Sequence, residues 1–249
     1  SSSVDPDGRL PALRHALCAA IARRHSPALP GSWRALEGGS LIPPQATAAQ
    51  SIDKYRRHAG GYDRSAERTM PLRRRAIDLL ELQPGQVVLD VGAGTGLSYE
   101  WLLQGVGERG RVLAFEQSPD MFEQARRRVR DKGWTRIWHC CESAHRVQLP
   151  EPADAALFNY VHDISRSPLA IEHLMKQVRP GGRIVIAGMK FFPWWTGPLN
   201  LLAWAKNRPY NVQASDLWSP WDRLEPWCDG FERWTTQWGM GYIASGRRR

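Results

Sequence analysis

The sequence predicts an α/β protein built on a doubly wound, mostly parallel β-sheet. From residue 70 onward, short apolar runs alternate with segments whose apolar residues recur every three or four positions, which is the pattern of strands followed by amphipathic helices. The apolar runs do not alternate strictly with polar residues, so they indicate central strands covered on both faces. Two final runs joined by Gln-Trp-Gly-Met-Gly predict a hairpin, which would place an antiparallel strand in the sheet.

Turn-forming and capping residues set the expected bounds of these elements. Pro71 starts the first helix and Pro84-Gly85 follow its end, while Ser118-Pro119 provide an N-cap and a first-turn proline for a later helix. The stretch Arg179-Pro-Gly-Gly ends the last long helix. Helices are expected over 71–82, 97–106, 118–130, 168–178 and 221–228. Strands are expected over 87–91, 111–116, 137–141, 155–160, 183–188, 231–236 and 242–245.

The first part of the chain differs from the rest. Residues 1–45 predict an N-terminal helical extension, because residues 10–21 carry apolar side chains at spacings of three and four and a linker rich in Pro, Gly and Ser follows. Residues 46–249 would then form the α/β domain. Within it, residues 190–219 are Trp-rich and longer than a strand-to-helix link requires, so we expect this insert to cover the substrate.

Composition narrows the class of protein. The chain has 249 residues, a formal net charge of +9, and no apolar run long enough to span a membrane or to serve as a signal peptide. The spacing of its four cysteines fits no metal site, and adjacent Cys140 and Cys141 make a poor disulfide pair. We therefore expect reduced thiols, a cytoplasmic location and no bound metal. The positive charge is compatible with RNA, anionic lipid or an acidic small substrate, and equally with solvated helix faces.

A glycine-rich turn follows the first expected strand. The residues of this turn are Gly92, Ala93, Gly94 and Gly96. Glycine permits positive φ angles and close approach of a ligand, and a helix N-terminus offers free N–H groups. A dinucleotide-binding turn would need its third glycine at Leu97. Asp90, which precedes the turn, would repel a pyrophosphate and favour a ligand that carries an ammonium or sulfonium charge.

With Asp90 ahead of these glycines, the sequence resembles the class I S-adenosylmethionine-dependent methyltransferases, whose hallmark is Asp/Glu-x-Gly-x-Gly-x-Gly, and within them the ubiquinone/menaquinone-biosynthesis type. The similarity covers about residues 55–246 and includes the Pro-Gly-Gly stretch. It implies S-adenosylmethionine as the cofactor, with Glu116 at the end of the second strand on the ribose hydroxyls. The other cofactor contacts that it implies are Gln117, Met121, Glu142, Ser143, Asn159 and Tyr62.

The resemblance also implies a catalytic site. His162, just past the fourth strand with Asp163 beside it, is the expected general base, although it would equally suit a cap of the next helix. Tyr55 and Tyr62 lie in a segment similar to the lid of relatives, or are packing aromatics. Trp194 and Trp195 would contribute to an aromatic wall against the substrate, or to a hydrophobic core under the insert.

The sequence gives less information about the molecule that accepts the methyl group. The resemblance implies a small-molecule or lipid-like acceptor, methylated on O, N or C. Quinone-type members place an acid after the fifth strand, where this chain has Gly188-Met189, which argues against the quinone assignment itself. Residues 198–208 suit an amphipathic helix that would allow transient contact with a membrane surface.

Three alternatives stay open from the sequence. An RNA-modifying methyltransferase agrees with the net charge, but the basic residues are scattered and no RNA-binding module is recognisable, so a nucleic-acid partner is disfavoured. A non-catalytic relative would bind the cofactor as a structural or sensing ligand. A nicotinamide oxidoreductase is disfavoured by the glycine spacing. The sequence leaves the oligomeric state open.

Overall fold

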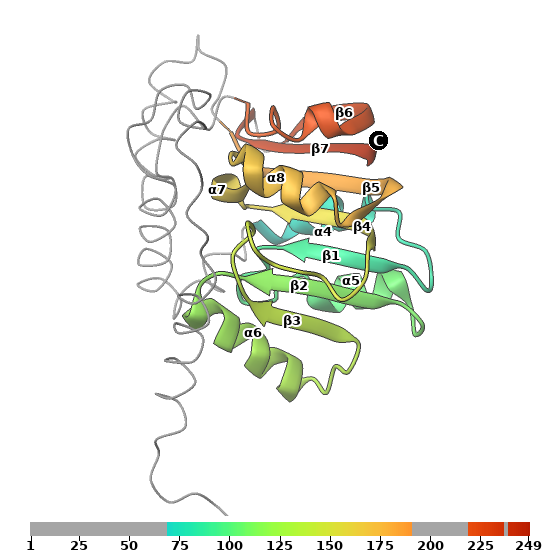
Figure 1. Cartoon of the computed structure of the whole chain (residues 1–249), viewed down its shortest axis with the longest axis vertical. Helices are drawn as coiled ribbons and strands as arrows, with labels where there is room; N and C mark the ends of the chain where they lie inside the picture. The colour runs from blue at the N-terminus through green and yellow to red at the C-terminus, as the bar shows by residue number, and fades with distance from the viewer. Residues whose placement is uncertain (1–68, 191–218, 237–238) are drawn as a thin grey trace, which may run out of the picture. The chain divides into compact units, whose positions relative to one another are not determined.

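The computed structural model describes residues 69–190, 219–236 and 239–249, and within them it contains one seven-stranded sheet (Figure 1). The strand order is β3-β2-β1-β4-β5-β7-β6. Neighbours from β3 to β5 are parallel, whereas β7 is antiparallel to both β5 and β6. The predicted fold class is confirmed, including the antiparallel strand at the C-terminal end. The expected N-terminal extension and the insert around 191–218 lie outside the described residues.

The strands and helices alternate along the chain as the sequence predicted. The strands are β1 (Val87–Val91), β2 (Arg111–Glu116), β3 (Ile137–Cys141), β4 (Ala153–Asn159), β5 (Val178–Met189), β6 (Cys228–Thr236) and β7 (Gly241–Arg248). The helices are α4 (Met70–Asp78), α5 (Tyr99–Val106), α6 (Pro119–Asp131), α7 (His162–Ser165) and α8 (Pro168–Met175). No helix in the described ranges is long and apolar enough to cross a bilayer.

Apolar residues cover both faces of the sheet, which explains why its strands lack alternation. On one face, Phe158 of β4 belongs to a buried cluster with Ile171 and Leu174 of α8. On the other face, Leu157 of β4 belongs to a second cluster with Leu102 of α5. Figure 1 shows α8 in front of the sheet and α4 behind it. Consecutive residues of a central strand therefore point into two different cores, and both must be apolar.

Some element bounds differ from the prediction for local reasons. The helix after β1 begins at Tyr99 and not at residue 97, because the turn that contains Gly96, with its φ angle of 77°, extends to Ser98. The Pro-Gly-Gly stretch lies inside β5, where the register with β4 shifts between Ala153 and Ala155. The expected helix over 221–228 is only a 3₁₀ turn at Glu225–Trp227. The short helix α7 was not predicted.

Parallel strand order fixes where a ligand would bind. The carboxyl ends of β1, β2 and β4 lie at the same edge of the sheet, because these three strands are neighbours and run in one direction. In such sheets, ligands bind outside the carboxyl ends of the strands. The glycine turn, Glu116 and the segment after Asn159 all lie at this edge.

Candidate functional site

The turn between β1 and α5 needs its glycines for two different reasons. Gly92 and Gly94 have positive φ angles of 58° and 60°, a conformation that other residues rarely adopt. A Cβ atom on Gly92 would lie 2.7 Å from Cγ1 of Val161, so packing also requires this glycine. A Cβ atom on Gly94 would meet no atom within 4 Å. Gly94 therefore borders open space, and it lines the cavity described below.

Glu116 is fixed at the end of β2 by two backbone groups. Its carboxylate accepts hydrogen bonds from the N–H of Gly94 (2.9 Å) and from the N–H of Ser118 (2.8 Å). The side chain is buried, and this burial raises the pKa of Glu116 to about 7, while the two N–H groups act in the opposite direction. The carboxylate thus faces the glycine turn in a fixed orientation, as the ribose contact that was predicted for it requires.

Asp90, in β1, and Arg73, from α4, are both buried near the glycine turn. Asp90 is 1% exposed, and burial raises its pKa to about 7, although the nearby Arg73 guanidinium lowers it and Glu116 raises it further. Arg73, from α4, is 5% exposed and donates a 2.9 Å hydrogen bond to Oγ of Ser98. Its guanidinium also lies 6.0 Å from the centre of the Tyr160 ring. The sequence does not single out Arg73, because this residue lies in a run of three arginines that the pattern assigns to a helix surface.

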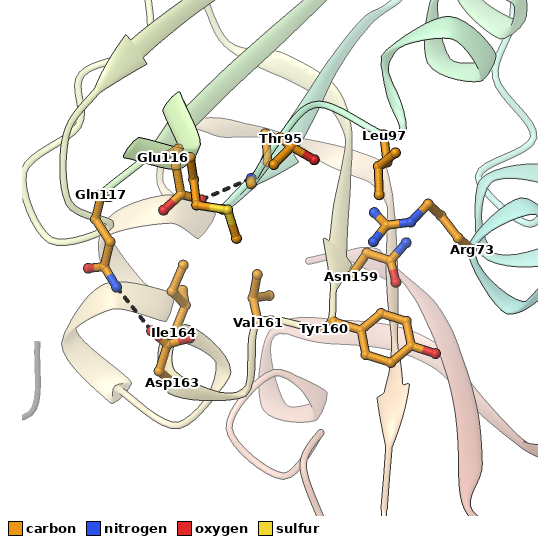
Figure 2. A pocket seen from close by; sticks show the side chains of 14 residues that line it. Arg73, Thr95, Leu97, Glu116, Gln117, Asn159, Tyr160, Val161, Asp163 and Ile164 are labelled. Atoms are coloured by element: carbon orange, nitrogen blue, oxygen red, sulfur yellow. Dashed lines mark hydrogen bonds between the residues drawn. The ribbon is translucent and has the colours of Figure 1, made fainter. Parts of the chain in front are cut away.

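A cavity opens beside the glycine turn (Figure 2). It contains about 520 Å³ of empty space, its open mouth included. Of the predicted site residues, the lining includes Gly92, Ala93, Gly94, Glu116, Gln117, Met121, Asn159 and Asp163. The lining residues that were not predicted are Arg73, Thr95, Leu97, Tyr160, Val161 and Ile164.

The two ends of the cavity differ in chemistry. Figure 2 shows an acidic end, formed by Glu116, Gln117, Asp163 and Ile164. It shows a second end formed by Arg73, Asn159 and Tyr160. The side chain of Gln117 crosses the acidic end and donates a 3.0 Å hydrogen bond to Oδ2 of Asp163. Burial raises the pKa of Asp163, against hydrogen bonds from its own N–H, the N–H of Ile164 and the Gln117 amide.

Several buried polar atoms near the Arg73 end have no hydrogen-bond partner among the described residues. They are Nε of Arg73, Oδ2 of Asp90, and the side-chain nitrogen and oxygen of Asn159. A buried polar group without a partner costs about 1–3 kcal/mol, so this cluster is adapted to a ligand that supplies the missing groups. S-adenosylmethionine fits the donor set, because its amino acid part carries a carboxylate and an ammonium group and its ribose carries two hydroxyls.

His162 does not line the cavity. Its Cε1 lies 3.0 Å from the position of a Cβ atom on Gly188, and its ring centre is 6.3 Å from that of Tyr242. Burial lowers the pKa of His162 to about 4, with help from the Arg166 charge, so the ring is neutral near pH 7. The neighbouring residue, Asp163, does line the cavity. The predicted role of His162 as a general base therefore gains no support from this geometry.

Other predicted contacts fall elsewhere. The side chain of Glu142 accepts hydrogen bonds from the N–H of Ser143 (2.7 Å) and from Arg146 (2.9 Å), and neither Glu142 nor Ser143 lines the cavity. Their contact with the cofactor stays a prediction. The predicted contacts Tyr55, Tyr62, Trp194 and Trp195 lie outside the described residues. In the described part of the chain, no group of three His, Cys, Asp or Glu side chains is arranged to hold a metal ion.

Comparison with known proteins identifies relatives of the part of the chain that forms this site. Residues 61–189 match the family of protein-L-isoaspartate(D-aspartate) O-methyltransferases. A protein-L-isoaspartate O-methyltransferase of Aeropyrum pernix is 34% identical over 112 residues, which cover 45% of this chain and 42% of that protein. A ubiquinone/menaquinone biosynthesis C-methyltransferase of Vibrio vulnificus is 29% identical over 118 residues, which cover 46% and 45% of the two chains. The chain spans about half the length of the curated relatives it matches.

A solved structure supports the fold. The N-methyltransferase NodS from Bradyrhizobium japonicum WM9, in complex with S-adenosyl-L-homocysteine, superposes with a TM-score of 0.57 at 16% identity. The superposition covers 80% of this chain and 98% of that chain. At this level of identity the likeness establishes the class I methyltransferase fold alone.

Proposed function

Because the chain belongs to the protein-L-isoaspartate(D-aspartate) O-methyltransferase family, we propose that it transfers the methyl group of S-adenosylmethionine to a carboxylate oxygen and so forms a methyl ester. The first candidate acceptor is an isoaspartyl side chain in a peptide, since relatives that are 34% and 31% identical are named for that substrate. The family match supports the reaction class. The properties of the cavity support the kind of acceptor.

The family match over residues 61–189 carries this proposal, and the described lining of the cavity agrees with it. This lining contains no histidine, lysine or cysteine, and its two carboxylates are engaged, Glu116 by backbone N–H groups and Asp163 by Gln117. A carboxylate acceptor is already ionised at neutral pH and needs no base before it attacks a methyl group. An alcohol or a carbon acceptor would need one.

The residues of the site have separate roles in this proposal. Glu116 binds the ribose hydroxyls, and the guanidinium of Arg73 binds the carboxylate of the methionine part of the cofactor. The side-chain oxygen of Asn159 accepts from the ammonium end, where the described residues leave it without a partner. Asp90 is buried and does not line the cavity, so its contact with the cofactor stays a prediction. When bound, the cofactor supplies an electrophilic methyl group, so the protein mainly orients the reactants and excludes water.

An assay with paired peptides tests the proposal. The full chain is incubated with methyl-tritiated S-adenosylmethionine and either an isoaspartyl peptide or the same peptide with an ordinary aspartyl residue. We expect label only on the isoaspartyl peptide, and mild alkali should release that label as methanol, because methyl esters hydrolyse under these conditions. Label that survives alkali would contradict carboxyl methylation. The turnover rate of His162→Gln should stay within about threefold of the wild-type rate. The pH–rate profile of this variant should show no step in the pH range in which a histidine titrates.

A small-molecule or lipid-like acceptor is the second candidate, and one observation favours it. The family match covers residues 61–189 and so does not include the Trp-rich segment that follows, which the sequence assigns to the acceptor side. The Vibrio vulnificus C-methyltransferase shows that similarity extends to relatives named for quinone biosynthesis. If neither peptide is labelled while a quinone precursor or a lipid amine is, this second candidate replaces the first.

A further inference from the structure

We propose that Asp163 and Gln117 select the adenine base of the cofactor, with Asp163 accepting a hydrogen bond from the exocyclic amino group. This assignment gives Asp163 a binding role in place of the catalytic role that the sequence suggested. It rests on the cofactor site and not on the identity of the acceptor.

The position of Asp163 in the cavity is the first argument. Glu116 marks the end at which the ribose binds, and Gln117 follows it directly in the chain. Figure 2 shows Gln117, Asp163 and Ile164 at this same end, away from Arg73. Ile164 and Met121 are buried, at 6% and 2% exposure, and they add apolar lining suited to a planar ring. A base attached to a ribose on Glu116 would therefore meet the Gln117–Asp163 pair.

The second argument is that Glu142 is hydrogen-bonded to other residues and lies outside the cavity lining. Glu142 is the acid that resemblance to other methyltransferases would place on the adenine amino group. In this structure its Oε1 accepts from the N–H of Ser143 and from Arg146, and the residue is outside the cavity lining. Asp163, in contrast, lines the cavity. Like Glu142, Asp163 accepts hydrogen bonds from neighbouring groups, but it belongs to the cavity lining, and the hydrogen bonds described for it, unlike one of those to Glu116, come from outside the glycine turn.

Hydrogen-bond chemistry supplies the third argument. The edge of adenine presents a donor, the amino group, next to an acceptor, ring nitrogen N1. A carboxylate beside an amide N–H presents the complementary order, and the 3.0 Å bond between Gln117 and Asp163 shows that the two groups lie close enough to act together. Hypoxanthine presents the reverse order, a carbonyl oxygen next to an N–H. An ionised Asp163 would then face an oxygen and could donate nothing to it.

Binding of two product analogues tests this inference without any methyl acceptor. S-adenosylhomocysteine and S-inosylhomocysteine differ only in the group at the 6 position of the base and in the proton on N1, and their affinities for the full chain are measured by calorimetry. We expect the wild type to prefer the adenosine compound by about tenfold or more, the effect of one hydrogen bond to a charged group. Asp163→Asn should reduce this preference to near unity, because an amide can donate to the inosine carbonyl.

Two further variants keep the result decisive if Asp163→Asn folds poorly. Glu142→Gln is the matched control and should keep the wild-type preference, whereas Gln117→Met should lose part of it. Equal affinity of the wild type for the two compounds would overturn the inference. A preference that is lost in Glu142→Gln and kept in Asp163→Asn would also overturn it and assign adenine to Glu142. Failure of the wild type to bind either compound would reject the cofactor site as a whole, while tight binding without base preference would reject the role of Asp163 alone.

Discussion

The N–H of Gly94 donates a 2.9 Å hydrogen bond to Oε2 of Glu116, and this contact joins the turn after β1 to the end of β2. The other carboxylate oxygen, Oε1, accepts from the N–H of Ser118 at 2.8 Å. A carboxylate can accept about four hydrogen bonds, so each oxygen of Glu116 retains capacity for a ribose hydroxyl. The residue that would hold the sugar is thus oriented by the protein before any ligand binds.

Glu116→Gln should weaken the binding of S-adenosylhomocysteine by about 1.5–3 kcal/mol, because the ribose hydroxyls lose a charged acceptor. Calorimetric titration measures the change. Glu123→Gln is the control, since Glu123 is a partly exposed residue of α6 that pairs with Arg126 and Arg127, and its affinity should equal that of the wild type. Equal affinities for Glu116→Gln and the wild type would remove Glu116 from the site.

Arg73→Ala should weaken the binding of S-adenosylhomocysteine about tenfold or more and leave the binding of 5′-methylthioadenosine nearly unchanged. The reason is that methylthioadenosine lacks the amino acid part that the guanidinium would bind. Arg74→Ala, one position along α4, is the control, because Arg74 is exposed and pairs with Asp78. An equal loss for both nucleosides in Arg73→Ala would mean that Arg73 supports the fold of the site and does not contact the ligand.

The stability of the ligand-free protein should fall as the pH rises from about 4 to about 7. Burial raises the pKa of Asp90 from 3.8 to about 7, so the folded state holds a proton in this window that the unfolded state has released. The stabilisation by this proton is fully present below the unfolded-state pKa of 3.8 and is lost as the pH rises through the folded-state pKa of about 7. Glu116 acts in the same direction, and His162, whose pKa is lowered, acts in the opposite direction.

The variant Asp90→Asn isolates the contribution of this one carboxyl group. Denaturant unfolding at about pH 5 and about pH 8 should show a smaller decrease in stability for the variant than for the wild type, with a difference on the order of 1 kcal/mol. A decrease of the same size in both proteins would show that Asp90 does not retain a proton in the folded state.

Gly94→Ala and Gly96→Ala should separate binding from folding. Both residues have positive φ angles, so each alanine costs about 1–2 kcal/mol of backbone strain. A Cβ atom on Gly96 would in addition lie 2.6 Å from the buried Tyr99 ring, whereas one on Gly94 would point into the cavity. Gly96→Ala should therefore unfold at clearly lower urea concentration than Gly94→Ala. Gly94→Ala should lose ligand affinity in calorimetry out of proportion to its loss of stability, and proportional losses in the two variants would contradict this assignment.

The sheet could be predicted from the sequence because its signal is local. The apolar run of β1, the proline at the start of α6 and the glycine turn each act through neighbouring residues, and all three lie where they were expected. Bounds at α5 and β5 were less accurate, since they depend on the φ angle of Gly96 and on the register between β4 and β5. Neither of these can be read from periodicity.

The site was predicted in part for a similar reason. Asp90, Glu116 and the glycines follow strands directly, so their positions are determined by the sheet. Arg73 and His162 depend on side-chain direction from helices, which sequence spacing does not determine. Arg73 points from α4 into the cavity although it resembles its exposed neighbours in sequence, and His162 packs beside Gly188, away from the cavity.

All described residues of the cavity lining fall between Arg73 and Ile164, and β5, β6 and β7 contribute none of them. The described part of the site for the methyl donor is therefore encoded before the last third of the chain. Recombination or grafting near Met189 would exchange the last quarter of the chain and leave these described donor contacts in place. A hybrid enzyme of this kind would act on a new substrate while it still binds the same methyl donor.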